Sequence, residues 1–387
     1  MAAIPTWRVD VVGSFLRPEP LKEAYRRHGL GDLPDEEMRQ AQDEAVRDVI
    51  AKQEAHGMPV VTDGEFRRLN FQDSFGDSVE GFAAKPATYQ FYAGRAVQEE
   101  RSLEAARPAQ RWESGLTEEG PAIVARRPVR ERLRLVRNRP LAEYRFASRV
   151  ATRPVKVTLV SPDRISQRFA WEESTSVYPD LDAFVDDVVA IERRMVGELV
   201  AAGCSYVQID GPGYTAYVDP PSLAGMRARG EDPAANLARS IRADNAIIAG
   251  LPDTSLGMHL CRGNTPAGWH REGTYDAIAE QVFAGLDHQR LLLEYDTERA
   301  GGFEPLRLVP SGKIVVLGLI STKVARIETV DELKRRIEEA SRFLAIDQLA
   351  LGPQCGFGSS LAQRPLTEDD QWRKLDVMQE TARQVWG

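Results

Sequence analysis

Short β-rich runs alternate with amphipathic helical stretches along most of the chain, and this alternation restricts the fold more than any other feature. Such a pattern predicts parallel strands that are joined by helices. Helical periodicity occurs near residues 35–57, 181–202, 234–249, 273–286, 330–344 and 367–385. The eight β-rich runs are residues 8–12, 59–63, 155–160, 205–210, 255–260, 290–295, 313–317 and 348–352. Eight parallel strands close a barrel, so we predict an α/β fold, a (β/α)8 TIM barrel, with residues 1–387 as one domain.

One segment interrupts the alternation. Residues 83–153 are polar and contain fourteen arginines between Arg95 and Arg153, and the segment is too long for an ordinary connection. We predict that it is an insertion after the second strand. Its arginines suit either a solvated helical excursion or dimerisation arm, or an anion-binding lid over the barrel mouth. A dimerisation arm would make the protein a homo-oligomer, whereas a lid would suit a carboxylated or sulfonated substrate.

The apolar fraction, the number of cysteines and the net charge restrict the classes of protein to which this chain can belong. The apolar fraction of 42% is enough for a large core, and three cysteines are too few for a disulfide framework, which predicts a reducing compartment. We expect Cys204 to be a core residue. No leader-like start and no stretch of about eighteen apolar residues is present, so we expect a cytoplasmic protein that does not span a membrane. A net charge of −8 argues against general nucleic-acid binding.

Four residues with metal-binding side chains stand at the ends of predicted strands. His259 and Cys261 lie in a His-Leu-Cys sequence, Glu294 ends the run at 290–295, and Cys355 follows the last run. Side chains alternate along a strand, so His259 and Cys261 point to the same face. Imidazole, thiolate and carboxylate are the donors that Zn²⁺ prefers. The sequence therefore predicts a zinc site, although a lone His-x-Cys would more often be a feature of core packing.

Other polar residues also follow predicted strands. Ser14 follows the first run, Glu65 follows the second, and Asp210 ends the fourth. Active sites of parallel barrels collect at the carboxyl ends of the strands. We therefore expect these three residues to lie near the zinc ligands.

These motifs together resemble the catalytic barrel of the cobalamin-independent methionine synthase family. The resemblance rests on Gly13-Ser14-Phe15, Gly64-Glu65, Gln208-Ile209-Asp210, His259-Leu260-Cys261, Glu294 and Gln354-Cys355-Gly356, and it covers nearly the whole chain outside the insertion. It implies that His259, Cys261, Glu294 and Cys355 are zinc ligands. It also implies that Ser14, Glu65 and Asp210 hold the amino-acid end of homocysteine.

The chain departs from this family where the methyl donor is held. The family has a histidine after the seventh strand, and Ile320 stands there in this chain. The acidic residue after the aspartate of strand four is replaced by Gly211, and the aromatic folate platform after strand three is replaced by Val160-Ser161-Pro162-Asp163. The length also leaves no room for the second barrel of the full-length synthases. We therefore expect sulfur activation to be retained and folate use to be weakened.

The sequence thus predicts a zinc-dependent thiol alkyltransferase. The reaction we favour is methyl transfer to homocysteine or a similar small thiol. The methyl donor would be methyltetrahydrofolate, a corrinoid protein or methylcobalamin, or another activated methyl compound. One alternative is epoxide or other alkyl transfer to a different thiol such as coenzyme M. From other classes, a non-catalytic zinc-binding barrel and a barrel of the uroporphyrinogen decarboxylase type also remain. If folate is used, His270 and Lys323 are the first candidates for the proton donor.

Overall fold

The computed structural model describes residues 6–83, 116–117, 120–121, 127–167, 169–170, 173–251, 253–265, 268–269, 271–359 and 366–387. A six-stranded parallel sheet in the order β12-β11-β10-β7-β6-β5 forms the centre of the molecule. Its strands are buried along their whole length, as expected for a sheet covered on both faces. They are β5 (Lys156–Val160), β6 (Tyr206–Asp210), β7 (Ser255–Leu260), β10 (Arg290–Glu294), β11 (Ile314–Ile320) and β12 (Leu349–Pro353).

Two further segments continue the ring between β12 and β5 through single bridges. Parallel bridges join Val9 to Leu351, Ser14 to Gly64, and Val61 to Val155. The prediction of full strands at 8–12 and 59–63 is therefore wrong. Each segment pairs with a different neighbour at each of its ends, so neither pairing is long enough to form a strand. The (β/α)8 prediction is otherwise confirmed, with six strands and two bridged segments arranged as in a TIM-barrel-like fold.

A polar cluster ties the first bridged segment to the sheet. Asp10 accepts hydrogen bonds from Lys156 Nζ at 2.7 Å and from the Tyr206 hydroxyl at 2.6 Å, and Arg290 Nε lies 3.3 Å from its second oxygen. Lys156, Tyr206 and Arg290 are the first residues of β5, β6 and β10. The cluster therefore lies at the amino ends of the strands, where residues of this architecture serve stability.

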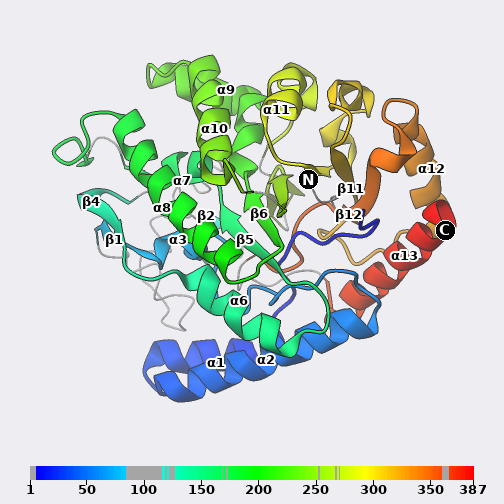
Figure 1. Cartoon of the computed structure of the whole chain (residues 1–387), viewed down its shortest axis with the longest axis horizontal. Helices are drawn as coiled ribbons and strands as arrows, with labels where there is room; N and C mark the ends of the chain where they lie inside the picture. The colour runs from blue at the N-terminus through cyan, green and yellow to red at the C-terminus, as the bar shows by residue number, and fades with distance from the viewer. Residues whose placement is uncertain are drawn as a thin grey trace.

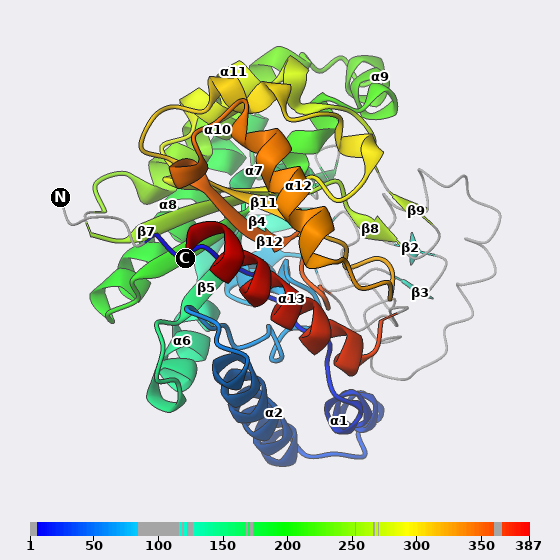
Figure 2. The same cartoon turned by 90° about the vertical axis from the view of Figure 1, so that its right-hand side faces the viewer.

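Helices surround the strands (Figure 1). The longer ones are α1 (Glu19–Leu30), α2 (Asp35–Ala55), α6 (Arg139–Val150), α8 (Leu181–Ala201), α9 (Pro220–Ala228), α10 (Pro233–Ile248), α12 (Val330–Ser341) and α13 (Glu368–Trp386). Shorter helical segments are α3 (Asp73–Gly76), α7 (Pro162–Gln167), η3 (Pro212–Tyr217), η4 (Tyr275–Ala277), α11 (Ala279–Gly285), η5 (Glu298–Ala300), η6 (Glu304–Leu308) and η7 (Ile346–Gln348). Figure 2 shows α12 and α13 side by side, and they contact β11 and β12 respectively. No helix among the described residues is both long and apolar enough to cross a bilayer.

The predicted insertion lies largely outside the described residues. Within it, β4 (Val129–Leu135) pairs antiparallel with β1 (Val79–Phe82), and α6 contacts α2, α8 and β5. The remaining strands are short pairs, β2 (Leu116–Thr117) with β3 (Gly120–Pro121) and β8 (Asn264–Thr265) with β9 (Gly268–Trp269). Since α6 lies against the barrel like an ordinary connecting helix, the extent of the insertion at 83–153 stays a prediction.

Candidate metal centre

Three of the four predicted ligands lie together at the carboxyl ends of two strands. His259 is the last but one residue of β7, Cys261 follows β7 directly, and Cys355 follows β12. One ligand atom from each of the three lies within 4.8 Å of the others, and the two sulfurs are 3.9 Å apart. All three residues are buried. Residues far apart in the sequence therefore form a compact group of two sulfurs and one nitrogen.

The orientation of His259 suits a metal ligand. Its Nδ1 lies 3.3 Å from the carbonyl oxygen of Leu292, the residue opposite it on β10. Its Nε2 is buried and has no hydrogen-bond partner among the described residues. A buried ring nitrogen without a partner is costly, whereas metal-bound histidines use one nitrogen for the ion and the other for a carbonyl or carboxylate. The donor set and this orphaned nitrogen fit Zn²⁺.

Electrostatic interactions within the group favour the thiolate form of Cys261. Hydrogen bonding from Cys355 lowers the pKa of Cys261 well below its ordinary value, with a further contribution from His259, although burial opposes the shift. Burial by itself would lower the pKa of His259, but the neighbouring Cys261 more than offsets this effect and raises it. A cation is thus stabilised at this point by the charge that the sulfurs carry.

Glu294, the fourth predicted ligand, is not part of this compact group. Its Oε2 accepts a 2.6 Å hydrogen bond from the backbone nitrogen of Arg262, and its Oε1 accepts from Arg299 Nε at 2.8 Å and Lys323 Nζ at 3.1 Å. Burial alone would raise the pKa of Glu294, but these cations overcome it and hold the pKa below its ordinary value. Sequence reasoning missed the pairing with Arg299, because nothing in the pattern distinguishes that arginine from a surface residue. Whether Glu294 binds the metal stays a prediction.

Asp210 lies beside the metal group. It ends β6 and is paired in register with His259 on β7. Gln208 Nε2 donates to its Oδ1 at 2.7 Å. Burial raises the pKa of Asp210 to about 7, with Glu65 and Cys261 also raising it and His259 lowering it. A cationic partner, such as the ammonium group of a substrate, would stabilise the charged form of Asp210.

Glu65 and Ser14 occupy neighbouring strand ends. Glu65 has a positive φ of 59° immediately after Gly64 at 69°, so the chain turns sharply there. Its Oε1 accepts a 2.7 Å hydrogen bond from Thr158, while its Oε2 is buried without a partner among the described residues. Ser14 touches the loop of Cys355 so closely that a Cβ added to Gly356 would lie 2.0 Å from its hydroxyl oxygen. Glu65 therefore contacts β5 through Thr158, and Ser14 contacts the loop that carries Cys355.

A buried ion pair supports Glu65 from outside the barrel. Arg68 donates to Glu143 Oε2 from Nε at 3.0 Å and from Nη2 at 2.6 Å. The same guanidinium donates to Thr158 Oγ1 at 2.8 Å, and Thr158 in turn holds Glu65. Glu143 of α6 thus fixes Arg68 and Thr158, which position the Glu65 side chain. The sequence offered no signal for this arrangement.

We expect Glu143→Gln to destabilise the protein by about 3–5 kcal/mol, because it removes the short ion pair of the buried Arg68 and leaves that guanidinium the longer 3.5 Å contact with Glu65. Urea unfolding followed by circular dichroism measures the change. The matched control is Glu380→Gln, which removes an acid from the fully exposed pair with Arg383 and should leave the midpoint almost unchanged. Equal midpoints for the two variants would contradict the role assigned to Glu143.

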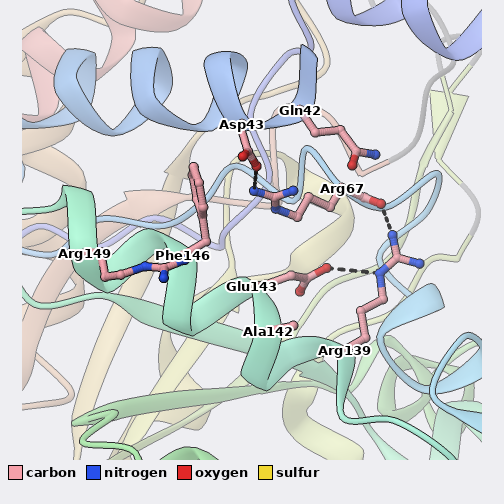
Figure 3. Close-up of a pocket in the computed structure, with 8 residues that line it drawn as sticks. All are labelled: Gln42, Asp43, Arg67, Arg139, Ala142, Glu143, Phe146 and Arg149. Atoms are coloured by element: carbon pink, nitrogen blue, oxygen red, sulfur yellow. Dashed lines mark hydrogen bonds and ion pairs between the residues drawn. The ribbon is translucent and has the colours of Figure 1, made fainter. Parts of the chain in front are cut away.

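A separate pocket lies on the outside of the barrel between α2 and α6 (Figure 3), with a volume of about 280 Å³. Its lining consists of Gln42, Asp43, Arg67, Arg139, Ala142, Glu143, Phe146 and Arg149. Arg67 pairs with Asp43, Arg139 pairs with Glu143, and Arg149 stacks over Phe146. Each of these arginines thus has an acidic or aromatic partner. None of the predicted site residues lines the pocket.

Comparison with known proteins agrees with the geometry. Residues 129–384 match the family described as the catalytic domain of cobalamin-independent synthase. The uncharacterized protein YxjG of Bacillus subtilis is 35% identical over 99% of this chain and 95% of its own length. The chain belongs to the cobalamin-independent synthase family. This is an enzyme family, and His259, Cys261 and Cys355 lie within the residues that match its catalytic domain.

More distant relatives of the family carry functional names. The methionine synthase of Pyrococcus abyssi is 25% identical over 91% of this chain and 87% of its own length. Among solved structures, a putative vitamin-B12 independent methionine synthase from Listeria monocytogenes has a TM-score of 0.72 at 22% identity, with both chains fully covered. A B12-independent methionine synthase from Shewanella, solved with selenomethionine, has a TM-score of 0.70 at 18% identity over 98% of this chain and 97% of its own. Both structures support the barrel-like fold.

Proposed function

We propose that this member of the cobalamin-independent synthase family is a zinc-dependent S-methyltransferase that methylates homocysteine or a similar small thiol. The observation that carries the proposal is the buried group of His259, Cys261 and Cys355, with the His259 Nε2 left without a protein partner. The names of the Pyrococcus relatives as methionine synthases give further support.

The ligand residues would hold the zinc ion, and Zn²⁺ at such a site lowers the pKa of a bound thiol so that its sulfur is a nucleophile at neutral pH. Cys261 and Cys355 supply two negative charges and His259 supplies a neutral nitrogen. Glu294 ends β10, the strand that pairs with β7, and Arg299 and Lys323 hold its carboxylate there. We propose that Glu294 is the fourth ligand. Burial of these residues would keep water away from a thiol bound to the ion.

Substrate binding is assigned to the three other strand-end residues. We propose that Asp210 and Glu65 bind the ammonium group of the amino-acid thiol, since both are buried carboxylates and Glu65 has an oxygen without a partner among the described residues. Ser14, which lies on the strand end next to Glu65, is proposed to donate to the substrate carboxylate. The methyl donor is a second small molecule, for which a methylated corrinoid is our first candidate.

The function is tested by incubating zinc-loaded protein with homocysteine, mercaptoethanesulfonate and 2-mercaptoethanol, each together with methylcobalamin or methyltetrahydrofolate. Mass spectrometry of the small molecules identifies any S-methylated product. We expect methionine from homocysteine, and a protein without added zinc after chelation is the control. Absence of every S-alkylated product with a fully loaded metal site would contradict the proposed function.

Asp210→Asn is expected to weaken binding of homocysteine far more than binding of mercaptoethanesulfonate. Only homocysteine has an ammonium group, and the variant removes a charge-assisted hydrogen bond worth roughly 1.5–3 kcal/mol. Calorimetric titration of both thiols into the zinc-loaded variant measures the difference. Equal losses for the two thiols, or a wild-type preference for the sulfonate, would instead favour alkylation of a thiol of the coenzyme M type.

A further inference from the structure

Arg271 is a buried arginine without an ion-pair partner among the described residues. The residue is 8% exposed, yet the hydrogen bonds of its guanidinium within the described part of the chain all go to neutral oxygens. One terminal nitrogen donates to the carbonyl of Pro212 at 2.6 Å, and the other lies 3.4 Å from the amide oxygen of Gln167. Its Nε is buried and has no hydrogen-bond partner in the described part of the chain. Burying a cation in this way is costly unless a negative charge arrives from elsewhere.

The position of Arg271 relates it to the metal group. Its backbone nitrogen donates to the carbonyl of Arg262 at 3.1 Å, and Arg262 follows Cys261 directly. Pro212, which its side chain contacts, lies two residues beyond Asp210. Thr215 of the same η3 segment donates to the carbonyl of Cys261 at 2.8 Å. The guanidinium therefore lies against the loop that leaves β6, and the backbone of Arg271 is bonded to the loop that leaves β7. These two strands carry Asp210 and His259.

Two described acids, Asp163 and Asp219, act on this charge without forming an ion pair with it. Burial lowers the pKa of Arg271, while Asp163, Asp219 and Cys261 act against that effect through space. Asp163 is already held by hydrogen bonds from Ser240 at 2.5 Å and Tyr217 at 3.0 Å. Asp219 caps α9 by accepting from the backbone nitrogen of Ser222, and it also accepts from the backbone nitrogen of Glu272. Both carboxylates are thus committed to other donors.

We propose that Arg271 binds an oxyanion, a carboxylate or sulfonate, carried by a small-molecule substrate of the site. The planar guanidinium fork matches such groups in a bidentate manner, and Nε is still available to complete the pair. The oxyanion belongs either to the acceptor thiol or to the methyl donor. The role of this oxyanion in transfer rests on the proposed thiol alkylation, whereas the binding of an oxyanion does not.

The test compares Arg271→Gln with wild type by calorimetric titration of zinc-loaded protein. The ligands are mercaptoethanesulfonate and 2-mercaptoethanol, which differ in the sulfonate. We expect the preference for the anionic thiol to fall about tenfold or more in the variant, the change expected for a lost charge-assisted hydrogen bond. Arg271→Lys, which keeps the charge, should recover part of the preference and shows whether the site is still folded. Arg194→Gln, on the exposed surface of α8, is the matched control and should keep the full preference.

Methyltetrahydrofolate, which carries carboxylates, is titrated in the same way to distinguish the two sources. Weaker binding of this donor with an unchanged thiol preference would place the oxyanion on the donor and still support the proposal. Ethanesulfonate, which has no thiol, separates the proposal from the proposed function, because its binding needs no zinc and no methyl transfer. If Arg271→Gln and wild type bind all of these anions equally, the proposal is overturned, whatever the zinc content.

Discussion

Replacing both Cys261 and Cys355 by serine is expected to reduce bound zinc from about one ion per chain to nearly none. Thiolates supply the strongest ligation in the group, and a serine hydroxyl stays protonated at neutral pH. Each single variant should lose most of the metal, because the sulfurs lie 3.9 Å apart and would share one ion. Metal analysis of protein purified in the presence of zinc measures the content.

Cys204→Ser is the matched control for these variants. Cys204 is buried, and burial raises its pKa to about 12, so it remains a thiol within the core. Its replacement should leave the zinc content unchanged. Glu294→Gln shows whether this carboxylate is the fourth ligand, since a true ligand should lower zinc affinity much more than a residue that only positions others. Stoichiometric zinc in the double serine variant would remove the proposed centre altogether.

Methylcobalamin is expected to support turnover at least about tenfold faster than methyltetrahydrofolate at saturating thiol. Departure of the folate nitrogen needs a proton, and general acid catalysis is typically worth about 10²–10⁴-fold. Ile320, which the sequence resemblance matches to a histidine of the family, is fully buried, and its side chain cannot donate a proton. Thr322, two residues later, is hydrogen-bonded to Gln354 at 3.0 Å. Initial rates of product formation with the two donors measure the ratio.

Comparable or faster turnover with methyltetrahydrofolate would contradict this expectation and would require an acid near the donor. Lys323 is one candidate, although its ammonium is held by Asp296 at 2.9 Å and by Glu294 at 3.1 Å. Lys323→Met would then abolish the folate reaction selectively. His270, the other candidate named from the sequence, lies outside the described residues, so His270→Ala would be tested beside it.

Hydrophobic periodicity predicted the six sheet strands to within a few residues, because a strand buried on both faces reads as a continuous apolar run. The same reasoning predicted full strands at 8–12 and 59–63, where the structure has single bridges. Periodicity does not show that a segment pairs with one neighbouring strand at one end and with another at the other end. Periodicity also predicted a helix that starts near residue 273. Gly273 instead has a φ of 146° and packs so closely on Val218 that a Cβ would lie 2.3 Å from its carbonyl oxygen. Helix α11 therefore begins only at Ala279.

The candidate site was predictable where short-range rules apply. Strand alternation placed His259 and Cys261 on one face, and barrel topology brought Cys355 to them. The groups that surround the site depend on tertiary contacts between distant residues, which no local pattern encodes. Examples are Arg299 beside Glu294, Glu143 behind Arg68, and Arg271 without a described ion-pair partner.

Zinc K-edge absorption spectroscopy of the loaded protein, with and without homocysteine, tests the central claim most directly. Coordination by His259, Cys261 and Cys355 predicts two sulfur ligands in the free protein. Binding of homocysteine as a thiolate should add a third sulfur, because the substrate sulfur must join the metal to be activated. A site without sulfur ligands, or a sulfur number that homocysteine leaves unchanged at saturation, would contradict the account.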